Sequence, residues 1–367
     1  MDIDSMKLAI ESVFPNNTVK YDDLGKPSVM VRIPRFRICD VIPGGSEAIH
    51  PAFIVNGKIL SEIYISKYQN VVENGRAYSL PNRDPQTYIT ADDAKKACET
   101  KGKGWHLMSN SEWAAIALWC RKNGFLPRGN TMYGKNHMNK HEHGSVTYIY
   151  SDKKLDGRTA TGSGPVAWAH NNNADGIYDL NGNVWEWVSG LRLKDGQIQV
   201  IPDNDSAAAV DESDNSALWR AVSTEGNYKE TVSTDVLYFD YNGADDSDDT
   251  PHIADGKLLL NNERTRSLYP KADTNTSHAL GKNRFCAVKA ACGLQVPERL
   301  IALGIMPDDG YDGEGSLFVR NYGERMAMRG GYWFNASDCG VFCLGLGTHR
   351  SASIDHIGFR AAYVELE

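Results

Sequence analysis

The chain has 367 residues, of which 41% are hydrophobic, 10% aromatic and 23% charged, and its formal net charge is −8. This composition is typical of a folded globular protein and excludes a collagen-like or largely disordered chain. It also lacks the basic excess of a nucleic-acid-binding protein and any apolar run near the roughly 18 residues of a membrane span. The N-terminus is acidic and unlike a signal peptide, and the seven scattered cysteines lack metal-binding spacing. We therefore expect a protein made in the cytoplasm with reduced thiols, no membrane span and no nucleic-acid partner.

Residues 1–45 are predicted to form a separate N-terminal segment. Its role would be either self-association or attachment to a larger structure. The first 14 residues place apolar side chains at helical spacing, and residues 28–42 alternate apolar and basic side chains as a half-exposed strand does. Asn56-Gly57 is a strong two-residue turn signal. It predicts a hairpin between residues 50–55 and 61–68.

Two further helices are predicted between the first hairpin and the middle of the chain. Thr90 is a suitable N-cap for a helix that runs to Gly102. A second helix is expected to begin near Ser109 and to end at Gly124, because apolar residues recur at helical spacing between them.

The middle of the chain is expected to consist of loops and short strands. Residues 125–175 are rich in Gly and Asn. Their His-rich run 137–143 is either a solvated loop or a segment that binds a transition metal adventitiously. Residues 190–290 carry hairpin-like fragments and are interpreted as an insertion. Their acidic run 240–252 is typical of an exposed loop; a calcium loop is the alternative, although the EF-hand order of ligands is missing.

Three segments in fixed order carry a family pattern. They are WHLMSNSEWAAIALWC (105–120), DGIYDLNGNVWEWVSG (175–190), and RGGYW (329–333) followed by IGFRAAYV (357–364). Together they resemble the formylglycine-generating enzyme (sulfatase-modifying factor) family, a variant of the C-type lectin fold. The resemblance implies an α+β fold with mixed twisted sheets, two helices and long loops. It predicts one C-type lectin-like domain over residues 46–367, with the 190–290 insertion inside it.

The residues of these motifs are expected to build the scaffold. Trp185 and Trp187 lie on one face of a strand, and Glu186 faces the other way and needs a charged partner, for which Arg329 and Arg360 are the candidates. The predicted scaffold consists of Asn183, Trp185, Glu186, Trp187, Arg329, Gly330, Gly331, Trp333, Gly358, Phe359 and Arg360.

The resemblance also implies a calcium site at the turn before the Trp-x-Trp strand. Its ligands would be the Asp179 side chain and the main-chain carbonyls of Leu180, Gly182 and Val184. A carboxylate with several carbonyl oxygens suits calcium. The alternative is that Asp179 caps its own turn. No other cofactor is expected to be required.

The enzymes of this family use a pair of reactive cysteines shortly after RGG, together with copper and oxygen. Here Asn335 stands at the position of the first cysteine, Cys339 lies one residue short of the second, and Cys343 has no counterpart. Asparagine cannot supply a thiolate for copper. We therefore predict that the chain is not an enzyme of this type. The alternative is a formylglycine-generating-type oxidase, or an inactive relative that uses the pocket to bind peptide or sugar.

Residues 332–356 have an unusual composition, because they contain no Lys, Glu, Gln or Met. These four types make up about a fifth of residues in ordinary proteins. The types present, apart from Trp333, are encoded by codons that end in a pyrimidine, as expected when the adenines of Asn codons are randomised. This pattern resembles the variable proteins of diversity-generating retroelements, whose formylglycine-enzyme-like fold carries a variable segment between RGG and GFR.

That resemblance implies a non-enzymatic protein that binds a protein or glycan on a cell surface. It would be displayed on a virion, such as a phage tail, or on a bacterial surface, and it is open to homo-oligomer formation. The predicted variable, ligand-binding positions are Tyr332, Phe334, Asp338, Cys343, Gly345, Gly347, Thr348, His349, Ala352, Asp355 and His356. Trp333, Cys339, Arg350 and Ile357, with the GFR residues, would form a constant frame. A functionless surface loop is the plain alternative.

Overall fold

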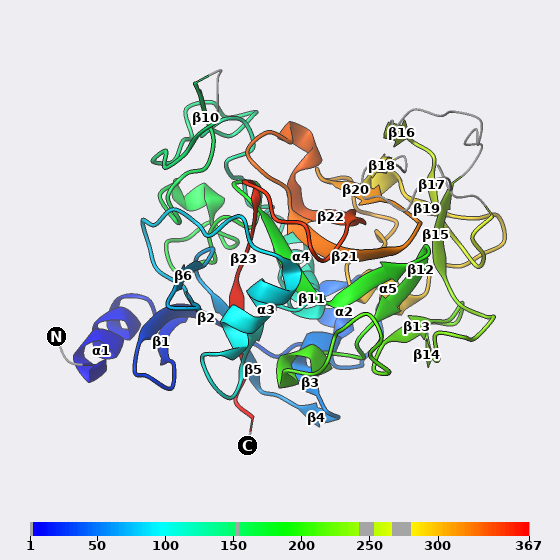
Figure 1. Ribbon diagram of the computed structural model, residues 1–367, viewed down its shortest axis with the longest axis horizontal. Helices are drawn as coiled ribbons and strands as arrows, with labels where there is room; N and C mark the ends of the chain where they lie inside the picture. Colours follow the sequence, from blue (N-terminus) through cyan, green and yellow to red (C-terminus); the bar gives the residue numbers. More distant parts are fainter. Residues whose placement is uncertain (1–2, 151–153, 242–252, 266–279, 367) are drawn as a thin grey trace.

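The computed structural model describes residues 3–150, 154–241, 253–265 and 280–366, which form an α+β fold built on two main sheets (Figure 1). The smaller sheet has the strand order β1-β2-β5-β24-β8, and its neighbouring strands are antiparallel. Its strands are β1 (Asn17–Tyr21), β2 (Pro27–Pro34), β5 (Glu62–Ser66), β24 (Ala361–Tyr363) and β8 (Trp105–Leu107). The first 45 residues thus contribute two strands to a sheet that also holds the C-terminal strand.

The larger sheet holds 13 strands among the described residues and mixes parallel with antiparallel pairs. Its main path is β16-β18-β20-β22-β21-β11-β12-β15-β17-β19, with β13, β14 and β23 attached at its sides. The strands are β11 (Trp185–Lys194), β12 (Gln197–Val200), β13 (Arg220–Val222), β14 (Tyr228–Lys229), β15 (Tyr238–Tyr241), β16 (Ile253–Asp255), β17 (Leu258–Asn261), β18 (Leu280–Arg284), β19 (Lys289–Ala290), β20 (Ser316–Val319), β21 (Glu324–Gly330), β22 (Gly340–Thr348) and β23 (Ile357–Phe359). The expected insertion over residues 190–290 therefore extends the central sheet. Its acidic run falls mostly outside the described residues.

The helices begin where the capping signals predict. Thr90 Oγ1 accepts the N–H of Asp93 at the start of α3 (Ala91–Glu99), and Ser109 forms a reciprocal capping box with Glu112 at the start of α4 (Asn110–Lys122). The N-terminal helix α1 (Ile3–Val13) is also confirmed. The described residues contain two more short helices that the sequence did not reveal, α2 (Ile38–Val41) and α5 (Glu298–Ala302).

Two local predictions are wrong. The strand expected over residues 28–42 ends at Pro34 and gives way to α2. Asn56-Gly57 does form a left-handed turn, with φ of 50° and 72°, but the turn joins only β3 (Ile54–Val55) and β4 (Lys58–Ile59). The expected second arm of the hairpin is β5, which pairs instead with β2 and β24 because its side chains are needed in the core of the smaller sheet.

The remaining short elements border the loops. Residues 125–175 are mostly loop, as predicted, with one small hairpin. The elements are the pairs β6 (Val71–Glu73) with β7 (Arg76–Tyr78) and β9 (Ile149–Tyr150) with β10 (Leu155–Asp156), and the 3-10 turns η1 (Pro51–Phe53), η2 (Val166–Trp168), η3 (Asp205–Ala208), η4 (Phe285–Ala287) and η5 (Ala336–Asp338).

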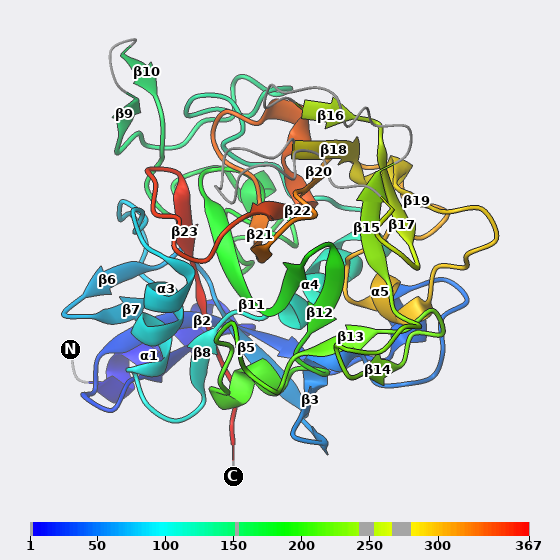
Figure 2. The same cartoon turned by 45° about the vertical axis from the view of Figure 1, so that its right-hand side comes forward.

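The core that positions the site lies between α4 and the larger sheet. The helix α4 packs against β11 and β22 (Figures 1 and 2). Trp113 on α4 is fully buried, and its indole N–H donates to the carbonyl of Val341 on β22 at 2.7 Å. A fully buried Trp with a satisfied N–H fixes the distance between a helix and a sheet. The segment that follows β21 therefore starts from a rigid base.

Candidate binding surface

The Trp-x-Trp strand is anchored by a buried ion pair. Glu186 is 1% exposed and Arg360 is fully buried, and the Nε and Nη2 atoms of Arg360 donate to the two Glu186 oxygens at 2.6 Å each. Arg360 also donates to the carbonyls of Ser66 and Tyr178. Of the two predicted partners, Arg360 is therefore the right one. Trp185 and Trp187 are buried, as expected of scaffold.

Arg329 has a different role from the one predicted. Its guanidinium donates to Asn110 Oδ1 at 2.6 Å and to the carbonyl of Gly304 at 3.0 Å, so that it links β21 to the start of α4. The two glycines that follow have φ of 89° and 84°. A Cβ at Gly331 would lie 2.5 Å from the Cys339 sulfur. The RGG motif is thus a structural requirement, because it lets the chain turn sharply against a buried cysteine.

Four of the predicted variable residues converge above this turn. The rings of Tyr332 and His356 stack with centroids 4.2 Å apart, and Asp355 Oδ1 lies 2.6 Å from His356 Nδ1. Phe334 is 56% exposed, whereas Trp333 beneath them is 1% exposed. Residues more than twenty positions apart in the chain therefore form one partly exposed aromatic and acidic group on a buried Trp. We refer to Tyr332, Phe334, Asp355 and His356 as the aromatic cluster.

Three residues of the 125–175 loop complete the cluster and were missed by the sequence reasoning. Tyr133 packs on Phe334 with ring centroids 5.0 Å apart. The Tyr148 hydroxyl donates to Asp355 Oδ2 at 3.1 Å, and the Arg158 guanidinium lies 4.1 Å over the Tyr148 ring. Arg158 also donates to the carbonyl of Asp355 at 2.8 Å. Tyrosines in a loop rich in Gly and Asn were the available signal, since such aromatic residues need a partner to pack against.

The other predicted variable positions do not join the cluster. Asp338 forms an ion pair with Lys282, with Nζ and Oδ2 2.8 Å apart. Thr348 and His349 are half-buried at the far end of β22. The remaining four are buried, which corrects the expectation that the whole set forms one surface: Cys343, Gly345, Gly347 and Ala352. β22 lies between β20 and β21, so that strand neighbours and the covering side chains exclude solvent from the first three.

The sequence matches a known protein family. Residues 17–217 match the model of the family described as "Sulfatase-modifying factor enzyme 1-like domain". The chain belongs to this family. Its sequence is also 31% identical over 163 residues to the bovine "Inactive C-alpha-formylglycine-generating enzyme 2", covering 44% of this chain, and 31% identical over 155 residues to the mouse protein of the same name. The chain spans about half the length of these curated relatives.

Several solved structures are distantly similar to this chain. PvdO from Pseudomonas aeruginosa is 15% identical with a TM-score of 0.35, and it covers 94% of this chain and 97% of that one. Treponema denticola variable protein 1 is 12% identical with a TM-score of 0.32, covering 95% and 98%. The Major Tropism Determinant P3c Variant is 12% identical with a TM-score of 0.30, covering 95% and 71%. The described residues contain no helix long and apolar enough to cross a membrane.

The two cysteines that follow the RGG turn, Cys339 and Cys343, are both buried. Cys339 is fully buried, and its thiol donates to the carbonyl of Tyr332. Burial raises the pKa of Cys339 well above its usual value and that of Cys343 to about 12. Thiolates are the reactive and metal-binding form, and these environments disfavour it. Asn335 accepts the N–H of Tyr332 through its Oδ1 at 3.1 Å, so that it stabilises the turn.

The residues at the proposed calcium turn fit a cation in part. Asp179 is 1% exposed at a φ of 63°; its Oδ2 accepts the N–H of Gly162, and its Oδ1 is buried without a partner. Burial raises the pKa of this carboxyl to about 6. The Val184 carbonyl, by contrast, already accepts from Gln69 Nε2 at 3.3 Å. Leu180 is buried and Gly182 has a φ of 78°, as a tight turn requires.

The His-rich run 137–143 is only partly exposed to solvent. His137 bonds to Thr131 Oγ1 at 2.9 Å and to Glu314 Oε1 at 3.0 Å, whereas His141 and His143 are exposed. Within the described ranges no three His, Cys, Asp or Glu side chains are grouped as metal ligands would be.

Proposed function

We propose that this chain is a non-enzymatic binding protein of the sulfatase-modifying factor family, and that a retroelement diversifies residues 332–356 by mutating adenines. The observation that carries the proposal is the aromatic cluster, which is built from predicted variable residues on a constant, buried frame. The composition of the segment supports the diversification, since residue types that need a codon ending in a purine are absent apart from Trp333.

The cluster has the physical character of a binding surface. Phe334 exposes 56% of its area and contacts the partly exposed rings of Tyr133 and Tyr332. Exposed aromatic residues give large contact areas at low conformational entropy cost, and they are frequent anchors of protein interfaces. The Asp355 carboxyl, which contacts His356, adds polar specificity at the same place. We propose a protein or glycan on a cell surface as the target, and display on a virion or a bacterial surface.

The alternative function is that of an oxidase, and the residues at positions 335 and 339 do not favour it. The position of the first catalytic cysteine is Asn335, and the nearest thiol, Cys339, is buried beneath Gly331. The names of the two curated relatives describe inactive proteins. Retention of the scaffold without the cysteine pair favours a fold that is used for binding.

The proposal is tested by exchanging the cluster and measuring binding. Immobilised protein is screened against bacterial surface lysates, and the captured target is then titrated with a variant carrying Tyr332→Ser, Phe334→Ser and His356→Ser. Two interface anchors of about 2 kcal/mol each correspond to a loss of roughly a thousandfold in affinity. A matched control exchanges Thr348 and His349 to Ser at the far end of β22 and should bind normally.

Binding that survives the triple exchange while the far-end control abolishes it would move the site to that end of β22. The gene neighbourhood gives an independent test of diversification: a reverse transcriptase and a near-repeat of the coding segment for 332–356 are expected beside the gene. Oxidation of a cysteine-containing peptide by purified protein with copper would contradict the non-enzymatic assignment.

A further inference from the structure

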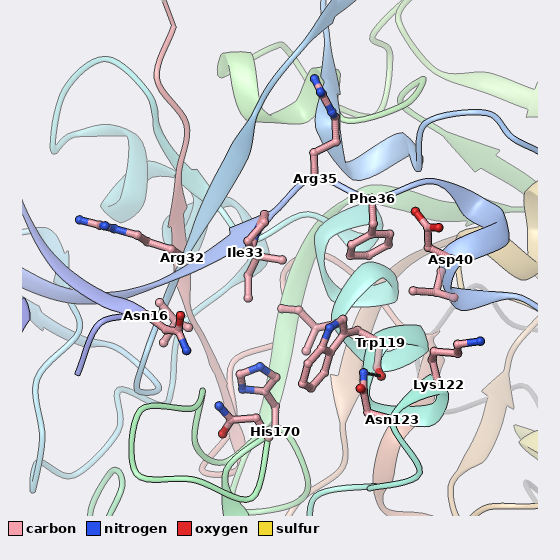
Figure 3. Close-up of a pocket in the computed structure, with 15 residues that line it drawn as sticks. Asn16, Arg32, Ile33, Arg35, Phe36, Asp40, Trp119, Lys122, Asn123 and His170 are labelled. Carbon is pink, nitrogen blue, oxygen red and sulfur yellow. Dashed lines mark hydrogen bonds between the residues drawn. The ribbon is translucent and has the colours of Figure 1, made fainter. Parts of the chain in front are cut away.

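A cavity of about 550 Å³ lies between β2, α2, the C-terminal half of α4 and the loop at His170 (Figure 3). Its volume lies within the range of pockets that hold small molecules. The wall is mainly apolar and is formed by Val31, Ile33, Phe36, Val41, Ile116 and Trp119. The cavity contains no residue of the segment 332–356, so it is a separate site.

His170 directs a hydrogen-bond donor into this cavity. Its Nδ1 accepts the N–H of Ile177 at 2.8 Å, which places the ring proton on Nε2. The residue is 5% exposed, and burial lowers the pKa of the ring to about 4, so the ring is neutral at pH 7. Among the described residues Nε2 has no hydrogen-bond partner, although the ring lines the cavity (Figure 3).

Trp119 supplies a second donor on the same wall. Its ring lies 5.2 Å from that of His170, and Figure 3 shows Ile33 and Phe36 directed at the same space. The indole N–H also has no partner in the described part of the chain. Donors that face an apolar cavity favour a ligand that brings an acceptor, because an unpaired donor loses its hydration without compensation.

The margin of the cavity carries two cations, Arg35 and Lys122, and one carboxylate, Asp40, and the Arg35 guanidinium donates to the Leu60 carbonyl at 3.4 Å. Arg35 and Lys122 extend from its edge, and Lys122 is exposed (Figure 3). Asp40 accepts the N–H of Arg37 at 2.7 Å at the start of α2, and the two cations outnumber this one carboxylate. This arrangement favours an anion, since long cationic side chains can turn toward a charge bound at the mouth.

We propose that this cavity binds a small carboxylate with a flat apolar body. The body packs between Trp119 and Ile33, and the carboxylate accepts from His170 Nε2 and the indole N–H while Arg35 and Lys122 balance its charge. The site does not depend on the proposed target binding by the aromatic cluster, so either assignment can fail without the other.

Calorimetric titration of the full chain with 2-naphthoate, and with 2-naphthamide as its neutral match, tests the proposal. The carboxylate should bind about tenfold more tightly than the amide, which corresponds to about 1.4 kcal/mol. Trp119→Phe keeps an aromatic ring at this position but removes the N–H donor, and Lys122→Glu reverses a charge at the margin of the cavity. Each change should weaken naphthoate binding about tenfold. Lys140→Glu, at another exposed lysine, is the matched control and should change nothing.

Thermal melts establish that each variant is folded before it is titrated. Absence of naphthoate binding at millimolar concentration would overturn the proposal. Equal affinity for acid and amide, or affinities that Trp119→Phe and Lys122→Glu leave unchanged, would do the same.

Discussion

Replacing Arg360 by Met should strongly destabilise the fold, because it leaves a buried carboxylate without its cation. Arg360 donates four hydrogen bonds: two to Glu186, at 2.6 Å each, and one each to the carbonyls of Ser66 and Tyr178. Glu186 would keep only the 3.0 Å bond from Gln69 Nε2. Removal of one partner of a buried ion pair costs about 3–5 kcal/mol, a large part of the roughly 5–15 kcal/mol that stabilises a domain.

Urea denaturation followed by circular dichroism measures this loss as a lower transition midpoint at an unchanged slope. The double variant Arg360→Met with Glu186→Leu should recover much of the loss, because it removes the unpaired charge together with its partner. A single variant within about 1 kcal/mol of the parent would refute the reasoning, since that cost is typical of an exposed pair. Failure of the double variant to recover would assign the loss to the two carbonyls instead.

Three further predictions concern the scaffold and the calcium turn. Trp185→Ala should cost about 3–5 kcal/mol, as loss of a large buried aromatic side chain does, whereas His349→Ala should cost less than about 0.5 kcal/mol in thermal melts; equal large losses would place both in the core. The pKa of Asp179 is about 6 in the folded chain and roughly 3.9 in the unfolded chain, so the folded state favours the protonated carboxyl. The stability that this protonation contributes is complete below about pH 4 and is lost as the pH rises through about 6. Without calcium, Asp179→Asn should therefore be more stable than the parent at pH 7, by at most about 3 kcal/mol, and should lose that part of the pH dependence. If the turn binds calcium, as we propose, calcium chloride should raise the melting temperature of the parent but not of Asp179→Asn; an equal response in both would contradict the site.

Local signals predicted local structure well. The caps at Thr90 and Ser109 act within four residues, so the helix starts followed directly from the sequence. The turn at Asn56-Gly57 was equally local, but the partners of β5 were not, because β24 lies about 300 residues further along the chain. Pairing over such a distance leaves no trace in the spacing of neighbouring residues.

The candidate site shows the same limit. Glu186 lies opposite Arg329 in the β11–β21 register, yet its ion pair is with Arg360, which follows the parallel strand β23. Composition identified the segment 332–356, but it could not separate the exposed ring of Phe334 from the buried Cys343. That distinction depends on β20 and β21, which enclose β22 on both edges.

The burial of β22 limits what diversification can achieve, and this can be tested in natural variants. Randomised codons would offer Asp, His and Asn at every varied position. At position 345, however, an added Cβ would lie 3.4 Å from Trp185 and 3.5 Å from Met328. Burying an unpaired charge there costs several kcal/mol, whereas position 334 is 56% exposed and tolerates any residue type. Sequencing many variants of the segment should therefore show charged residues at 334 and few at 343 or 345. Equal frequencies of charge at the three positions would mean that β22 opens when the protein binds its target.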